Sequence, residues 1–387
     1  MSANLPDFAR IEVDSSFEMN EWNAYYKVKK VEQQTDRIKC RASNMELLRV
    51  VAMFMVLMVH ANFRSLGMPD ENLVHQKPLF AFGQYFFEAL SIGCVNLFVL
   101  LSGWFGIKPR RSGFCNFIFQ CLFFSVGIWV VMLLLGKVEI SSFRDFAEGS
   151  AGVFYLLEDE GWFIKSYIGL YLLAPLLNLY VEKVDRTTLR KFLIAFYVFQ
   201  TLYAWVSNGA SFFMRGYSTM SFIGLYLLAR YVRLYPMRWT SCSGKSDLLV
   251  YFGLSIVLVL VVFVLEYVGF ASLTYRMYSY TSPLVIMAAF YLLLAFSKWK
   301  LGHHAWINWL GVSSFAVYLL HTNGYLVESF LGSVRYLFTI YDGFLSLTVV
   351  FLYLLAVFAV SVLLDQPRKY LWKTYVSKIV ERWTRSC

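Results

Sequence analysis

The sequence predicts an all-α integral membrane protein with about ten transmembrane helices and both termini in the cytoplasm. Of its 387 residues, 58% are hydrophobic and 16% are charged, a balance that soluble domains do not show. Ten apolar runs have a length suited to crossing a bilayer as a helix. They lie at residues 44–63, 84–106, 114–136, 162–181, 191–207, 216–235, 247–268, 281–297, 305–327 and 343–364.

The charges of the loops orient these helices. Ten spans place both termini on one side, and the loops predicted on that side carry thirteen Lys and Arg residues against seven on the other. Because basic loops stay in the cytoplasm, both termini are predicted to be cytoplasmic. The same distribution accounts for the net charge of +10, since the basic residues form no domain that would bind nucleic acid.

The apolar runs divide the chain into three parts. Residues 1–43 are predicted to be a cytoplasmic extension, 44–366 a transmembrane domain, and 367–387 a basic cytoplasmic tail. The extension lacks the apolar core of a cleavable signal peptide, so we expect the first helix to be an uncleaved anchor. The six cysteines are scattered, without metal-ligand spacing to a histidine, and predict neither a disulfide framework nor a metal site.

The first predicted helix carries two residues that are costly inside a bilayer, Arg49 and His60. They are eleven positions apart, about three full turns, so both side chains project from one face, about 16 Å apart along the helix axis. His60 is suited to take a proton near neutral pH. The alternatives are an Arg49 that reaches the headgroups and a neutral, structural His60. Glu46 either completes a capping box with Ser43 or pairs with Arg49.

The stretch from Asn44 to His60, which reads N-x-E-L-L-R and then ten residues before a histidine, resembles the opening helix of membrane acyltransferase family 3. That family comprises bacterial O-acyltransferases of surface polysaccharides. Three later stretches are similar to the same family in the same order: "GCVNLFVLLSGWF" (93–105), "GWFIKSYIGLYLLAPLLN" (161–178) and "SSFAVYLLHTN" (313–323). The resemblance spans about residues 44–370.

The resemblance implies a multi-pass protein of the bacterial inner membrane that moves an acyl group, usually acetyl, from cytoplasmic acyl-CoA to a sugar hydroxyl. It implies that His60 is catalytic and that Arg49 engages the donor or organises the site. Many members carry arginine-x-x-arginine after the second helix, where this chain reads "IKPRRSG". Lys108 therefore stands for the first arginine and Arg111 for the second, and we expect Lys108, Arg110 and Arg111 to bind the phosphates of acyl-CoA.

Five further residues are weaker candidates for binding substrate. Glu88 either orients His60 or binds the acceptor, or it faces water near the interface. Asn96 either donates a hydrogen bond to an oxyanion or serves helix packing. Trp162 and Tyr171 either stack on a sugar ring or belong to the aromatic belt of the membrane interface. His321 is predicted at a depth similar to that of His60, where it holds the acceptor or belongs to a packed polar network.

The sequence thus predicts a membrane O-acyltransferase whose partners are acyl-CoA, a cell-surface or lipid-linked carbohydrate and the lipid bilayer. An amine, a peptide or a lipid hydroxyl stays open as the acceptor. The alternative from another class is a transporter that uses Arg49 and His60 along a proton or solute pathway. Against it stands the lack of visible repeat symmetry and of paired Gly- or Pro-broken helices.

Overall fold

The computed structural model describes residues 42–138, 161–207 and 212–385. These residues form helices joined by short loops, with no β-strand among them. Helices lie at all ten predicted spans: α2 (Ser43–Val59) with the π-helical turn η1 (His60–Arg64), α4 (Pro78–Ser91) with α5 (Cys94–Phe105), α6 (Arg111–Leu134), α8 (Trp162–Lys183), α9 (Arg186–Phe199) with the π-helix η3 (Gln200–Val206), α10 (Thr219–Leu234), α11 (Gly244–Tyr267), α13 (Pro283–Lys298), α14 (Ala305–Ser313) with α15 (Phe315–His321), and α17 (Gly343–Leu371).

Several helices lie outside the predicted spans. They are α3 (Glu71–Gln76), α12 (Ala271–Met277), α16 (Val327–Ile340), η6 (Trp372–Val376), α18 (Ser377–Arg385) and the short 3-10 turns η4 (Met214–Gly216) and η5 (Arg238–Ser241). Helix α17 continues through the boundary predicted at residue 366, so the residues assigned to a tail begin inside a helix. The predicted extension, apart from its last two residues, lies outside the described part of the chain.

Six of the helical segments described are long and apolar enough to cross a membrane. They are Ser43–Arg64, Pro78–Phe105, Arg111–Leu134, Trp162–Lys183, Gly244–Tyr267 and Gly343–Trp383. Their outer faces expose large apolar side chains, such as Leu172, Val264 and Leu363, each at least 59% exposed. Water would disfavour such a surface, whereas lipid accepts it. The all-helical membrane fold is therefore as predicted, and the count of ten and the side of the termini stay predictions.

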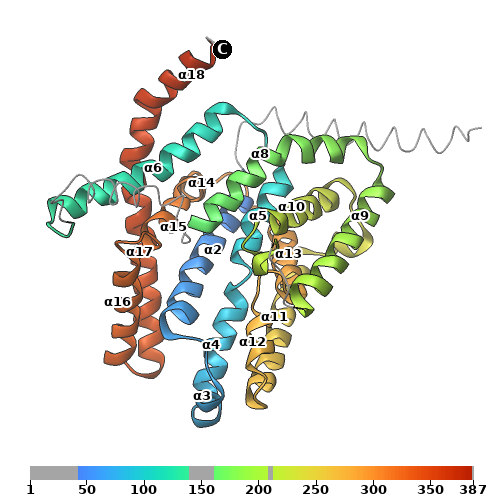
Figure 1. The fold of residues 1–387 in the computed structure, drawn as a ribbon, viewed down its shortest axis with the longest axis vertical. Coiled ribbons are helices and arrows are strands. Elements are labelled where there is room, and N and C mark those ends of the chain that lie inside the picture. Colours follow the sequence, from blue (N-terminus) through green and yellow to red (C-terminus); the bar gives the residue numbers. More distant parts are fainter. Residues whose placement is uncertain (1–41, 139–160, 208–211, 386–387) are drawn as a thin grey trace, which may run out of the picture. The chain divides into compact units, whose positions relative to one another are not determined.

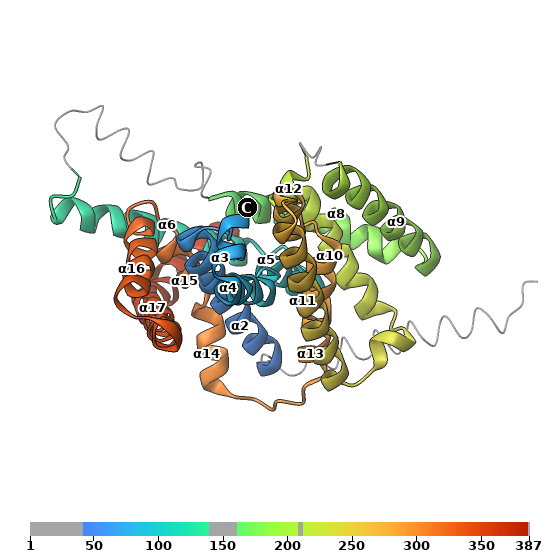
Figure 2. The same ribbon diagram turned by 90° about the horizontal axis from the view of Figure 1, so that it is seen from below.

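Helix α2 lies in the middle of the described bundle. Figures 1 and 2 show α16 and α17 on one side of it and α11 and α13 on the other. Helix α2 packs against α4, α5, α13 and α14, and α5 packs in turn against α10. The ionisable residues of the first helix are thus surrounded by other helices, which is the arrangement that such residues require inside a membrane.

The second predicted span is interrupted in its middle, where α4 ends at Ser91 and α5 begins at Cys94. Tyr251 of α11 satisfies a backbone carbonyl beside this break, since its hydroxyl donates to the carbonyl of Leu90 at 2.5 Å. Further back in α4, Tyr278 donates to the carbonyl of Tyr85 at 2.8 Å. Buried carbonyls without such partners would be unfavourable, so the broken helix is stabilised by its neighbours.

Gly103 sets the contact between α5 and α10. A Cβ placed on Gly103 would overlap the backbone carbonyl of Tyr226 and come within 3.0 Å of the Ala229 side chain. Gly103→Ala should therefore push the two helices apart and lower the free energy of unfolding by about 1–3 kcal/mol, the usual cost of overpacking. Thermal unfolding in detergent measures this. Gly253→Ala on α11 is the matched control, since nothing lies within 4 Å of its Cβ position; equal stability of both variants would contradict the prediction.

Candidate active site

His60 lies where α2 changes from α-helical to π-helical geometry, and α4 holds this turn in place. The side-chain amide of Asn62 donates to the carbonyl of Gln84 at 2.8 Å and to the carboxylate of Glu88 at 3.0 Å. The backbone N–H of Phe63 also hydrogen-bonds to Glu88. A π-helical turn leaves backbone groups without their regular partners and is frequent at functional sites. Glu88 is 1% exposed and therefore supports the segment that carries His60.

His60 and His321 contact each other across 261 positions of sequence. Nδ1 of His60 lies 2.8 Å from Nε2 of His321, and the two ring centroids are 5.0 Å apart. Nδ1 of His321 lies 2.5 Å from the carbonyl oxygen of Val317, one turn earlier in α15. The two histidines were predicted at similar depth, and the structure brings them into one hydrogen-bonded chain.

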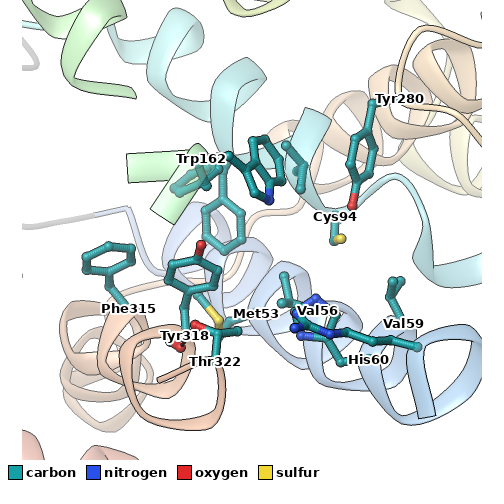
Figure 3. A pocket seen from close by; sticks show the side chains of 14 residues that line it. Met53, Val56, Val59, His60, Cys94, Trp162, Tyr280, Phe315, Tyr318 and Thr322 are labelled. Carbon is teal, nitrogen blue, oxygen red and sulfur yellow. Dashed lines mark hydrogen bonds between the residues drawn. The ribbon is translucent and has the colours of Figure 1, made fainter. Parts of the chain in front are cut away.

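His60 also lines a cavity of about 50 Å³, enough for a few water molecules. Side chains from five parts of the chain surround it (Figure 3), and most of them are aromatic or aliphatic. The full lining is Met53, Val56, Val59, His60, Arg64, Cys94, Val95, Phe98, Trp162, Phe163, Tyr280, Phe315, Tyr318 and Thr322. Such surroundings lower the polarity around the partly exposed imidazole, which strengthens the electrostatic interactions of a reacting group.

Trp162 lies in this cavity, as a substrate-binding residue would. Its ring lies 6.0 Å from that of Tyr280 in a stacked arrangement and 4.3 Å from that of Tyr217 in an edge contact. Asn96 is not part of the lining. Its amide nitrogen donates to the carbonyl of Tyr280 at 3.1 Å, and its Oδ1 is buried without a hydrogen-bond partner among the described residues.

Arg49 forms an ion pair with Glu46 at 2.5 Å, and its side chain is 30% exposed. Met53 and Val56, which lie between Arg49 and His60 in the sequence, line the cavity with His60, and Arg49 is not part of this lining. The capping box predicted for Ser43 and Glu46 is wrong, because the N-cap of α2 is Ala42 and no side chain caps it.

Ser43 forms hydrogen bonds with residues in and just before α14. Its hydroxyl donates to Oδ1 of Asn308 at 3.0 Å and accepts from the backbone N–H of His304 at 2.9 Å. These bonds join the beginning of α2 to α14. The hydroxyl of Ser43 therefore bonds to a distant helix and does not cap α2, and Glu46 pairs with Arg49.

The basic loop between α5 and α6, residues 106–110, begins at Gly106 with φ +73°. Lys108 and Arg110 in this loop, and Arg111 directly after it, are exposed. The side chain of Asn178 donates to the carbonyl of Ile107 at 2.9 Å, and Tyr226 accepts from the N–H of Ile107 at 3.0 Å. The backbone of the loop is thus fixed by α8 and α10 while its cationic side chains face outward, which suits a phosphate-binding surface.

Tyr171 of α8 contacts the basic loop and does not line the cavity of His60. Its hydroxyl donates to the carbonyl of Arg110 at 3.0 Å, and its ring packs on Phe114. Trp162 begins α8 and Tyr171 lies near its middle, nine residues and about 13.5 Å further along the axis. The two predicted sugar-stacking residues therefore lie at different places, and a role of Tyr171 in binding substrate stays a prediction.

Four residues near these sites escaped the sequence prediction. Arg64 and Cys94 line the cavity with His60, as does Tyr280 from the loop before α13. Arg230 on α10 lies against Gly106, with its Nε buried and unpaired among the described residues. Among these residues, only Arg64 could have been predicted from sequence spacing, since it follows His60 by one helical turn. The others come from separate helices or loops, where sequence spacing gives no indication of contact.

The fold and the cavity together define a helical membrane protein with a histidine-centred site in mostly apolar surroundings. A family model described as an acyltransferase domain matches residues 43–366. The chain therefore belongs to membrane acyltransferase family 3, and it is a membrane acyltransferase, as the resemblance implied. A comparison with curated proteins found no match, and neither did a comparison with solved structures.

Proposed function

We propose that this protein transfers an acyl group, acetyl by default, from cytoplasmic acyl-CoA to a hydroxyl of a cell-surface or lipid-linked carbohydrate in the bacterial inner membrane. The observation that carries the proposal is His60, a partly buried base that lines a cavity of mostly apolar side chains and lies, by helical period, on the same face of the helix as Arg49. A thioester is already activated, so the enzyme must mainly position it and make an alcohol nucleophilic.

The chemistry is a direct transfer. His60 takes the proton of the acceptor hydroxyl while the oxygen attacks the thioester carbonyl; the C–S bond breaks, and His60 returns the proton to the leaving thiolate. The products are a carbohydrate ester and free CoA, so atoms and charges balance. Trp162 and Tyr280, which both line the cavity, are the aromatic side chains that contact the acceptor sugar.

The donor enters from the basic loop. Lys108, Arg110 and Arg111 bind the nucleotide phosphates, and Arg49 and the face of α2 that leads to Met53 guide the pantetheine arm toward His60. Arg230, with its unpaired Nε beside Gly106, adds a cation at the base of the loop. This arrangement explains why a membrane helix carries two ionisable residues, because donor and acceptor approach from opposite sides.

The proposal is tested with sealed inverted vesicles, whose cytoplasmic face is outward. Radiolabelled acetyl-CoA is added outside, and label is followed into alkali-labile esters of the glycan fraction, with vesicles that lack the protein as the control. We expect transfer in inverted vesicles and little in right-side-out vesicles. Uptake of an unmodified solute without ester formation would contradict the proposal and favour a transporter.

The basic loop supplies a separate prediction. Replacing both Lys108 and Arg111 with glutamine should raise the KM for acetyl-CoA about tenfold, equivalent to about 1.4 kcal/mol of binding, and leave kcat largely unchanged. The effect should shrink at high salt because exposed charges are screened. Lys300→Gln, another exposed lysine, is the control. A fall in kcat at constant KM would contradict a donor-binding role for the loop.

A further inference from the structure

We propose that His321 is a positioning residue that keeps the proton of His60 on Nδ1, so that Nε2 of His60 is the basic nitrogen. This inference rests on the proposed function, in which His60 is the base. It assigns the reacting atom and gives His321 a role through His60, distinct from the contact with acceptor that the sequence suggested.

The assignment begins at Val317. A backbone carbonyl oxygen can only accept a hydrogen bond, so Nδ1 of His321, which lies 2.5 Å from it, must carry a proton. His321 is 4% exposed and packs on the ring of Phe330. A second proton would make it a buried cation, which is unfavourable. His321 is therefore neutral, and its Nε2 carries a lone pair.

The lone pair of His321 decides the tautomer of His60. Nε2 of His321 lies 2.8 Å from Nδ1 of His60, and two lone pairs cannot face each other at this distance. Nδ1 of His60 is therefore the donor, and Nε2 of His60 is left with the lone pair. The hydrogen bond made by one ring nitrogen fixes the state of the other.

This control of the tautomer matters because a free neutral imidazole prefers the opposite tautomer, with its proton on Nε2. Without an acceptor at Nδ1, a large share of His60 would hold the proton on the nitrogen that must act as base. A backbone carbonyl anchors the whole chain, so the orientation does not depend on any mobile group. As His60 takes the acceptor proton, His321 also stabilises the imidazolium that forms.

Two substitutions separate this role from simple packing. His321→Gln places an amide oxygen near the position of Nε2, where it can accept from His60. His321→Met has similar volume and offers only a weak acceptor. We expect His321→Met to lose about 10- to 100-fold in kcat, as partners that orient a histidine typically do, with KM for both substrates unchanged. His321→Gln should retain most of the activity, and exposed His75→Met should behave as wild type.

Nitrogen-15 spectra of histidine-labelled protein provide a readout that does not need activity. The His60 signals, identified by their loss in His60→Gln, should show a protonated Nδ1 and an unprotonated Nε2 in the wild type, and a mixture in His321→Met. Equal losses in both His321 variants at unchanged unfolding temperature would overturn the proposal, as would a protonated Nε2 in the wild type. If the wild type shows the expected spectrum but transfers no acyl group, the proposed function is contradicted and the assignment of the His60 tautomer is not.

Discussion

His60→Ala is expected to reduce kcat for acyl transfer by about 10²- to 10⁴-fold, the range that general acid–base catalysis contributes. The other imidazole in the hydrogen-bonded pair, His321, should not replace it, because His321 is not part of the cavity lining. The KM for acetyl-CoA should change little, since the proposed function places the donor phosphates at the basic loop and not at His60. Initial rates of label incorporation at saturating donor measure the effect.

His60→Gln keeps a polar side chain of similar size and should be just as inactive, which separates loss of the base from a packing defect. His303→Ala removes an exposed histidine from the loop before α14 and is the matched control. If the two His60 variants and the wild type transfer label equally while folded, His60 is not the base and the transporter alternative gains support.

Arg368→Met is expected to lower the free energy of unfolding by about 3–5 kcal/mol, the cost of leaving a buried charge without its partner. Asp365 and Arg368 are almost fully buried and bonded twice, from Nε to Oδ1 at 2.8 Å and from Nη2 to Oδ2 at 2.9 Å. Gln120 donates to Asp365 and Asn116 accepts from Arg368, so the ion pair joins α17 to α6. Thermal unfolding in detergent, together with membrane yield, measures the loss.

Two further variants sharpen this prediction. The double variant Asp365→Leu with Arg368→Met should recover much of the stability, because it removes both buried charges together. Arg335→Gln breaks an ion pair with Glu328 whose side chains are 48% and 78% exposed, and should cost less than about 1 kcal/mol. Similar effects of Arg335→Gln and Arg368→Met would show that burial does not determine the strength of these pairs.

The helical fold could be predicted because membrane helices leave a strong local signal of length and apolar content. The shared face of Met53, Val56 and His60, which all line the cavity, follows in the same way from helical period. What the sequence did not predict depends on contacts between distant segments. The capping box failed because Ser43 bonds to Asn308 on α14. The bonds of Asp365 to Gln120 and of Arg368 to Asn116, which join α17 to α6, likewise leave no signal in the spacing of these residues.

In the candidate site, too, single residues could be named from the sequence, whereas contacts between distant segments could not. His60, Trp162 and His321 were named in advance, but the 2.8 Å contact between the two histidines joins α2 to α15 and no spacing encodes it. Tyr171 was also named, and helical rise alone shows that it lies about 13.5 Å from Trp162 along α8, where it contacts the basic loop. Cys94 and Tyr280 reach the cavity only through the break between α4 and α5 and the loop before α13.

Helix α5 has one end at each of the two sites. Cys94 at its start lines the cavity, and Gly106 directly after its end opens the basic loop. Its twelve residues extend about 18 Å as an α-helix, and close packing at Gly103 prevents it from sliding along α10. If the nucleotide binds at the basic loop and the reaction takes place at His60, as proposed, α5 fixes the distance between these two points. The length of the donor's arm should then matter as well as its charge, because a thioester on a shorter carrier would bind without reaching His60.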